Sequence, residues 1–339
     1  MRKSRITLLA LLVALAMVAA GCGPSEPEAE ESPTEAAESK DAPQFAAGST
    51  MDTIQKRGNV IVGTKFDQPL FGQRNPITNE IEGFDVEMAK IIAQGIFGGT
   101  LEEAAEKVEF VETPTPVREA NIQQGSVDFI VATYTINDTR KQVVDFAGPY
   151  YVAGQDIMVN VDDDSINGVE DLNGKKVCSV QGSTSIANVV AEAPQADISI
   201  SFDTYSRCAE ALRDGRVEAV TTDNTILVGL IREDEGETFK LVGQTFTTEP
   251  YGVGITKGDD AFRDFLNDKI EESYEEGSWE AAFERTVGTA GIETPEPTPV
   301  DRYASSGASP GATTTGAASP GATTTGATST TAPATTTTN

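Results

Sequence analysis

Charged and hydroxyl side chains lie next to several short apolar runs of this chain. A guanidinium can hold a carboxylate through two parallel hydrogen bonds, backbone N–H groups at the start of a helix add anion contacts, and an aspartate can neutralise an ammonium. Together these groups suit a zwitterionic ligand, and an additional pair of cations is useful only if that ligand carries a second carboxylate. The residues concerned are Lys65, Arg118, Thr133, Thr135, Arg140, Ser183, Thr184 and Asp223.

Each of these residues also has an ordinary structural explanation. Lys65 could be a solvated loop residue, and either arginine could be paired with a nearby acid on the surface. Ser183-Thr184 and Asp223 could do no more than cap the helices that follow them. The nearby acids are Glu112 and Glu119 for Arg118, and Asp138 and Asp145 for Arg140. We favour a binding site because these residues come after strands in the chain, and ligands of parallel sheets bind beyond the carboxyl ends of the strands.

The composition of the chain excludes several other kinds of chemistry. Its 339 residues include 53 acidic and 25 basic residues, no histidine and three cysteines, with a formal net charge of −28. Such an acidic chain lacks the basic face that nucleic acid requires. Without histidine there is no Ser-His-Asp triad, Cys-His pair or His-ligated zinc, and three scattered thiols cannot hold a four-thiolate cluster. We therefore expect no catalytic residue, no metal and no cofactor.

The elements that must position these residues are short buried strands and amphipathic helices. Strands are predicted at 60–62, 127–132, 157–161, 176–180 and 217–221, and helices from Phe84 onward and at 262–274. This alternation predicts an α/β fold with mostly parallel sheets. Two groups of strands, joined by extended segments near 147–156 and 244–254, predict two lobes with a double crossover. Ligands of such sheets bind beyond the carboxyl ends of the strands.

The N-terminal residues predict an export signal. A basic start precedes an apolar run at 6–20, which is too short for a comfortable membrane span and typical of a signal peptide at 1–21. The run ends at Ala19-Ala20-Gly21-Cys22, which resembles a bacterial lipobox and indicates that the Cys22 thiol is acylated after export. The alternative is an ordinary secretory signal with a chance cysteine.

The remaining boundaries follow from shifts in composition. Residues 22–51 are rich in acids, Pro and Ser and predict a disordered stalk, whereas residues 293–339 predict a disordered Ser/Thr/Pro/Gly tail. Between them we expect lobe one at 52–148 plus 253–292, and lobe two with the hinge strands at 149–252.

Two further cysteines, Cys178 and Cys208, lie in the expected second lobe. In an exported protein they can form a disulfide, and the alternative is two buried free thiols. A bridge would close a loop of about thirty residues and add roughly 3 kcal/mol to stability, so that its role would be structural.

Four motifs occur in a fixed order along the chain. They are Gly83-Phe84-Asp85-Val86-Glu87-Met88, Thr133-x-Thr135-x4-Arg140 followed by Asp145-Phe146-x2-Pro149-Tyr150, Gln181-Gly182-Ser183-Thr184, and Val217-Glu218-Ala219-Val220-x-x-Asp223. Over about residues 52–290 this combination resembles the family-3 extracellular solute-binding proteins, the polar amino-acid receptors of ABC importers. The resemblance implies a two-lobed, type II periplasmic-binding-protein-like fold with two crossover hinge strands.

Two further groups of residues narrow the resemblance. They are Gly63-Thr64-Lys65-Phe66-Asp67-Gln68-Pro69 with Arg74-Asn75-Pro76, and Cys178-Ser179-Val180 with Tyr205-Ser206-x-Cys208. With them the chain is most similar to actinobacterial glutamate-binding lipoproteins.

The resemblance implies how the α-groups of an amino acid would be held. Arg140 would bind the α-carboxylate, with help from Thr135 and from the backbone N–H of Thr184. The Thr133 carbonyl and the Asp223 carboxylate would take the α-ammonium.

The resemblance also implies a subsite for the ligand side chain. Lys65 and Arg118 would hold a γ-carboxylate, Ser183 belongs to the lobe-two contacts, and Arg74 is a further candidate. A histidine that some relatives have in the lobe-two wall is absent here, because the chain has no histidine.

The resemblance implies a lipid-anchored, monomeric receptor on the outer face of the cell membrane. It would close on L-glutamate, or on aspartate, and deliver the amino acid to an ABC permease driven by a cytoplasmic ATPase. The alternatives are the same role for glutamine or another polar amino acid, and a dehydratase-like enzyme on the same fold. An enzyme would need a general acid or base, for which only Glu249 and Asp223 are candidates.

Overall fold

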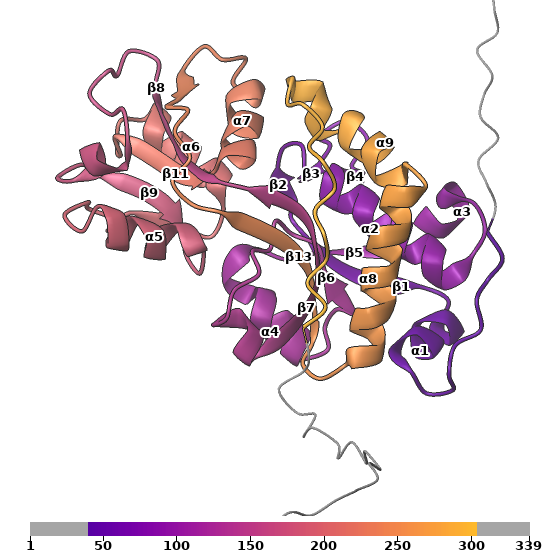
Figure 1. Ribbon diagram of the computed structural model, residues 1–339. Helices are drawn as coiled ribbons and strands as arrows, with labels where there is room; N and C mark the ends of the chain where they lie inside the picture. Colours follow the sequence, from indigo (N-terminus) through magenta and orange to yellow (C-terminus); the bar gives the residue numbers. More distant parts are fainter. Residues whose placement is uncertain (1–39, 304–339) are drawn as a thin grey trace, which may run out of the picture. The chain divides into compact units, whose positions relative to one another are not determined.

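The computed structural model describes residues 40–303 (Figure 1). The predicted signal peptide at 1–21, the acylation of Cys22, and most of the predicted stalk and tail lie outside the described residues. The described chain contains two five-stranded sheets and one three-stranded sheet. Helices pack on both faces of each large sheet, which confirms the predicted two-lobed α/β fold.

Lobe one is built on the sheet β5-β1-β6-β13-β7, with the small sheet β2-β3-β4 beside it. Its strands are β1 (Val60–Thr64), β2 (Asp67–Gln68), β3 (Gly72–Arg74), β4 (Ile81–Glu82), β5 (Val108–Glu112), β6 (Phe129–Ile130), β7 (Val144–Ala153) and β13 (Glu249–Thr256). Its helices are α1 (Thr50–Arg57), α2 (Phe84–Phe97), α3 (Leu101–Ala105), α4 (Arg118–Gln123), α8 (Asp260–Glu275) and α9 (Ser278–Glu284), with 3₁₀ turns η1 (Thr115–Val117), η2 (Arg140–Gln142) and η4 (Val287–Ala290).

Lobe two is built on the sheet β10-β9-β11-β8-β12. Its strands are β8 (Gln155–Asn160), β9 (Val177–Val180), β10 (Ser201–Phe202), β11 (Ala219–Asp223) and β12 (Phe239–Leu241). Its helices are α5 (Thr184–Glu192), α6 (Tyr205–Arg213) and α7 (Asn224–Glu233), with the 3₁₀ turn η3 (Val169–Leu172).

Both large sheets are mixed rather than mostly parallel. In lobe one, β1 pairs in parallel with β5 and β6, but β13 is antiparallel to both β6 and β7. In lobe two, β9 is parallel to β10 and β11, whereas β8 is antiparallel to β11 and β12. The sequence could not reveal this, because the spacing of apolar residues carries no information on strand direction.

Alternating side chains divide the core of lobe one into two parts. Val60 and Val62 of β1 point into a large cluster beneath α1, α2, α8 and α9, whereas Ile61 packs against a smaller cluster that includes Ile122 of α4. This is the period-two pattern of a strand that is covered on both sides.

Helix α2 begins at Phe84, as its apolar spacing predicts. The preceding Gly83 has φ +130°, and a Cβ atom there would lie 2.3 Å from the backbone of Phe71. Only glycine fits this close approach, which brings Asp85, in the first turn of the helix, to full burial.

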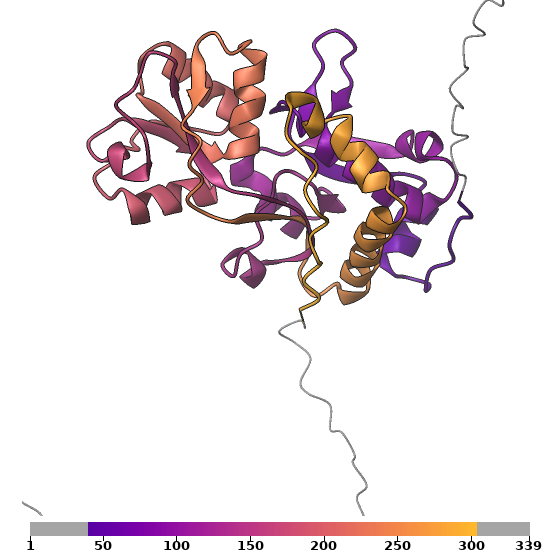
Figure 2. The same ribbon diagram turned by 45° about the horizontal axis from the view of Figure 1, so that its top comes forward.

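The two lobes are joined by paired strands. β7 leads from lobe one into β8, and β13 returns the chain. The two strands are antiparallel, with Val144 opposite Thr256 at one end and Ala153 opposite Glu249 at the other. Figures 1 and 2 both show β7 and β13 crossing side by side. These strands are the predicted double crossover.

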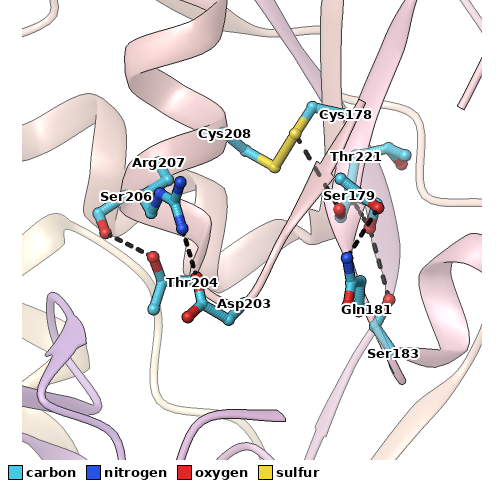
Figure 3. Close-up of a disulfide and its surroundings, with 11 residues drawn as sticks. Cys178, Ser179, Gln181, Ser183, Asp203, Thr204, Ser206, Arg207, Cys208 and Thr221 are labelled. Carbon is cyan, nitrogen blue, oxygen red and sulfur yellow. Dashed lines mark hydrogen bonds and ion pairs between the residues drawn. A yellow bond between two sulfur atoms is a disulfide. The ribbon is translucent and has the colours of Figure 1, made fainter. Parts of the chain in front are cut away.

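The disulfide predicted between Cys178 and Cys208 is present, with a Cα–Cα distance of 5.6 Å. It links β9 to α6, two elements of the same apolar cluster (Figure 3). The alternative of two free thiols is therefore excluded.

Two predicted boundaries differ from the structure. Helix α1 begins at Thr50, and Phe45 packs edge-on against Phe265 of α8, although residues up to 51 are too acidic and proline-rich overall to predict order. At the other end, Tyr303 accepts a hydrogen bond from the Phe146 N–H, so residues 293–303 lie along lobe one. A few aromatic and polar contacts hold these segments, and an average composition does not register such single residues.

The C-terminal segment runs beside α8 in both views (Figures 1 and 2). The Asp301 N–H donates to the Gly148 carbonyl, and the Arg302 guanidinium pairs with Asp268 and Glu271 of α8. Near the other end of the described chain, Lys40 pairs with Glu272 and Glu276 of the same helix.

No helix among residues 40–303 combines the length and the apolar character needed to cross a bilayer.

Candidate functional site

A small cavity lies where the two lobes meet. Lobe one contributes Thr115, Arg118, Thr133, Thr135 and Arg140, and lobe two contributes Ser183, Thr184, Ser185, Tyr205, Asp223 and Ile226. The free volume between these residues is about 10 Å³, roughly the space of one water molecule. Most of the residues predicted as ligand contacts are thus brought together, from both sides of the crossover strands.

Lys65 is buried beside this cavity. Its side chain follows β1, is 3% exposed, and donates from Nζ to Thr115 Oγ1 at 2.6 Å. Burial lowers the pKa of Lys65 well below its usual value, and the neighbouring Arg118 charge lowers it further. The solvated-loop explanation of Lys65 is therefore wrong.

Arg118 is held by backbone carbonyls and by an aromatic ring. Its Nη1 donates to the carbonyl oxygens of Ala132 and Thr133 at 3.0 and 3.3 Å, and the guanidinium lies 4.2 Å from the centre of the Tyr134 ring. Within residues 40–303 its Nε has no hydrogen-bond partner. The pairing with Glu112 or Glu119 that the sequence left open is not observed.

Arg140 connects the two lobes. Its Nη1 donates to the Thr135 carbonyl at 2.7 Å, its Nη2 donates across the lobes to the Gly182 carbonyl at 3.0 Å, and its Nε lies 3.3 Å from Glu119 Oε1. Burial lowers the pKa of Arg140 to about 10. Asp145, a surface partner that the sequence allowed, pairs with Lys257 instead.

Thr133 is fixed from the opposite side by Asp85. The Thr133 backbone has φ +43°, an uncommon value for a non-glycine residue, and its N–H donates to Asp85 Oδ2 at 2.9 Å. The other Asp85 oxygen accepts from Tyr150 Oη at 2.5 Å. Burial raises the pKa of Asp85 to about 7. The buried Asp of the Gly-Phe-Asp motif thus holds the turn that carries Thr133 and Thr135.

In lobe two, helix α5 begins at the cavity. Ser183 is its N-cap, and its Oγ accepts from the Ile186 N–H at 3.4 Å. The next residue, Thr184, donates from Oγ1 to Glu249 Oε2 at 2.8 Å. Glu249 also accepts from Asn188 and Thr247, so its carboxylate anchors the first turn of α5 to the start of β13.

Asp223 is buried at the end of β11. It stands at the N-cap position of α7, but its side chain makes no capping bond, and Tyr251 Oη donates to its Oδ2 at 2.5 Å. Its Oδ1 has no hydrogen-bond partner within residues 40–303. Burial raises the pKa of Asp223 to about 7, and the nearby Glu249 charge adds to this effect. The side chain is therefore available to a cationic group in the cavity.

Arg74 is the exception among the predicted contacts. It is exposed on β3, stacks 4.5 Å from the centre of the Phe66 ring, and donates to Asn79 within the β3–β4 turn. It does not line the cavity. Local packing in the hairpin explains this arginine, so its assignment as a ligand contact is not supported.

Several lining residues were not among the predicted contacts. They are Thr115, Ser185, Tyr205 and Ile226. Thr115 and Tyr205 each lie three residues after a strand of a large sheet, β5 and β10 respectively, and neither of these strands was predicted from the sequence. The only available signal for Tyr205 is its place in the Tyr205-Ser206-x-Cys208 segment.

Comparisons with known proteins agree with this geometry. Residues 60–289 match the family described as bacterial extracellular solute-binding proteins, family 3. The chain is 42% identical over 252 residues to the glutamate-binding protein GluB of Corynebacterium efficiens, covering 73% of this chain and 84% of that protein. It is 37% identical over 239 residues to the ABC transporter glutamine-binding protein GlnH of Bacillus subtilis, covering 70% and 84% respectively.

A solved structure shows the same fold. An ancestral arginine-binding protein bound to glutamine superposes with a TM-score of 0.62 at 35% identity, covering 68% of this chain and 99% of that one.

Proposed function

The chain belongs to family 3 of the bacterial extracellular solute-binding proteins, and on that premise we propose that it is the receptor of an ABC importer and captures L-glutamate between its lobes. Ligand that contacts both lobes binds the closed form best and so raises its population. The closed receptor then delivers the amino acid to the membrane permease. The chain itself makes and breaks no bond.

The proposal depends on the charges at the cavity. Lobe one brings Lys65, Arg118 and Arg140 to burial, and within residues 40–303 neither Lys65 nor Arg118 forms an ion pair with an acid. Lobe two offers Asp223 and the first turn of α5. Lobe one thus offers three cationic side chains, of which Arg140 also contacts Glu119, and lobe two offers the Asp223 carboxylate; this set suits a ligand with two carboxylates and one ammonium.

A ligand with a neutral side chain fits this arrangement less well. Glutamine would leave Lys65 and Arg118 without a carboxylate, and buried cations without a partner are costly. Aspartate is one methylene shorter, a difference of about 1–3 kcal/mol, so it is the nearest competitor.

An enzymatic role has less support. Of the two carboxylates that could serve as acid or base, Glu249 is held by three hydrogen bonds, and its relation to α5 is structural. The GluB and GlnH relatives described above are named as binding proteins.

Export and acylation of Cys22 would place the receptor on the outer face of the membrane. Cys22 lies outside the described residues, and this part of the proposal depends on the sequence alone. A Cys22→Ala variant expressed in a bacterial host that acylates lipoproteins should move from the membrane fraction to the medium. Retention in the membrane fraction would contradict lipid anchoring.

Titration with the twenty amino acids tests the function. The chain without residues 1–22 should gain melting temperature with glutamate, and the stabilisation should grow with log concentration above saturation. The double variant Lys65→Met/Arg118→Met should lose far more affinity for glutamate than for glutamine. Arg74→Met, which removes an exposed arginine outside the cavity, is the matched control and should bind normally. Equal losses for both ligands would contradict the side-chain assignment.

A further inference from the structure

Tyr205 is the aromatic residue that lobe two contributes to the lining of the cavity. We propose that Tyr205 is a specificity-determining residue, whose phenolic hydroxyl donates a hydrogen bond to the side-chain carboxylate of the bound amino acid. The inference depends on the proposed function, because it adds a lobe-two contact to the same site.

The position of Tyr205 follows from contacts between the lobes. It is the first residue of α6, and the next residue, Ser206, donates from Oγ to Asp67 Oδ2 of lobe one at 3.3 Å. Asp67 is two residues from Lys65, and its charge acts on the Lys65 ammonium. The first turn of α6 therefore meets the turn after β1, which carries one of the two cations assigned to the side-chain carboxylate.

The surroundings of the Tyr205 hydroxyl favour a donor role. The hydroxyls of Thr222, Ser185 and Ser183 lie near it, and Thr222, which accepts from Ser185, can donate to the phenolic oxygen and leave the phenolic hydrogen for the ligand. Burial raises the pKa of Tyr205, so the phenol keeps its proton at neutral pH. Asp223 also lies close by, at the site assigned to the ammonium.

The ring of Tyr205 is rigidly held. It packs in the apolar cluster of lobe two, 5% exposed, together with Cys208 one turn further along α6. The disulfide from Cys208 to Cys178 fixes that turn to β9, the strand that leads to Ser183 (Figure 3). A preorganised donor loses little conformational freedom when the ligand binds.

The hydroxyl is the group to remove, because the ring alone supplies the packing of Tyr205 in the apolar cluster. Tyr205→Phe keeps the ring and its packing. The matched control is Tyr274→Phe, which removes the hydroxyl of a tyrosine on α8 whose donor bond goes to the Pro149 carbonyl, outside the cavity.

Calorimetric titration of both variants and the wild type with glutamate tests the inference. Loss of a hydrogen bond to a charged group should weaken binding by Tyr205→Phe about 10- to 100-fold, with the control within about twofold of the wild type. An affinity of Tyr205→Phe equal to that of the control would overturn the role of Tyr205 alone. A wild type that does not bind glutamate would instead overturn the proposed function.

A second measurement covers the case in which Tyr205→Phe lowers the melting temperature of the free protein. Incorporation of 3-fluorotyrosine at position 205 keeps the hydroxyl and nearly the same volume but makes the phenol a stronger donor. At pH 6.5 the substituted protein should bind glutamate more tightly, and unchanged or weaker binding would count against the hydrogen bond.

Discussion

The buried carboxyl of Asp223 should make ligand binding depend on pH. Its pKa is raised to about 7 by burial and by Glu249, while Tyr251, Arg118 and Arg140 act in the opposite direction. Only the ionised carboxylate can pair with an ammonium, so the proton must leave before the ligand binds. With a pKa of about 7, the apparent Kd should be about 11-fold weaker at pH 6, about twofold weaker at pH 7 and nearly unaffected at pH 8.

The stability of the free protein should change in the opposite sense. A carboxyl whose pKa is raised on folding contributes stability that is complete below its ordinary pKa of 3.8 and is lost as the pH rises to about 7. Three pH units correspond to an upper bound of about 4 kcal/mol. Glutamate should therefore add more to the melting temperature at pH 8 than at pH 6, although the free protein is less stable at pH 8.

Calorimetry in buffers of different ionisation enthalpy measures the released proton directly. We expect about 0.9 proton released per glutamate at pH 6 and about 0.1 at pH 8. Asp85 also has a pKa of about 7, and its two oxygens accept from the Thr133 N–H and the Tyr150 hydroxyl, so Asp85→Asn tests whether this carboxyl releases the proton instead. A Kd that is equal at pH 6 and pH 8 would refute the reasoning, and loss of proton release in Asp85→Asn would assign the linkage to Asp85.

Three further results are expected. Arg140→Ala should weaken glutamate binding by about 2–5 kcal/mol, since it removes a buried charged partner; calorimetry showing an unchanged affinity would remove Arg140 from the site. Replacing Cys178 and Cys208 together by Ser should lower the free energy of unfolding in urea by roughly 3 kcal/mol, and an unchanged transition midpoint would contradict this value. Gly229→Ala places a Cβ atom 2.8 Å from the Pro69 carbonyl oxygen of the other lobe, so the variant should resist closure and bind glutamate more weakly. X-ray scattering should then show a smaller glutamate-induced compaction than in the wild type, whereas an unaltered response would show that the contact yields.

The candidate site could be anticipated to the extent that it obeys the topology of parallel strands. Lys65, Arg140 and Asp223 all follow strands, so the rule for carboxyl ends marks them without any knowledge of distance. Tyr205 follows the two-residue strand β10, which is too short to be predicted from its apolar pattern, so the rule could not mark it. Arg74 is the opposite case. It lies near the predicted motif in the sequence, but it packs on the Phe66 ring and does not line the cavity.

The fold could be anticipated where one element carries its own signal. The apolar spacing after Gly83 marks the start of α2, and the run at 60–62 marks β1. The strand predicted at 127–132 is only Phe129–Ile130 in the structure, because backbone pairing ends before burial does. Strand direction and the packing of residues 293–303 depend on contacts between distant segments, which composition and periodicity do not contain.

Lys40 and Arg302 both pair with acidic residues of helix α8, which has a practical consequence. Both ends of the described chain, near residues 40 and 303, are therefore attached to lobe one. A fluorophore or fusion partner at either end would move with lobe one and would not report a movement of lobe two. A reporter of ligand capture therefore needs at least one label on lobe two, for example at the exposed Val190 of α5.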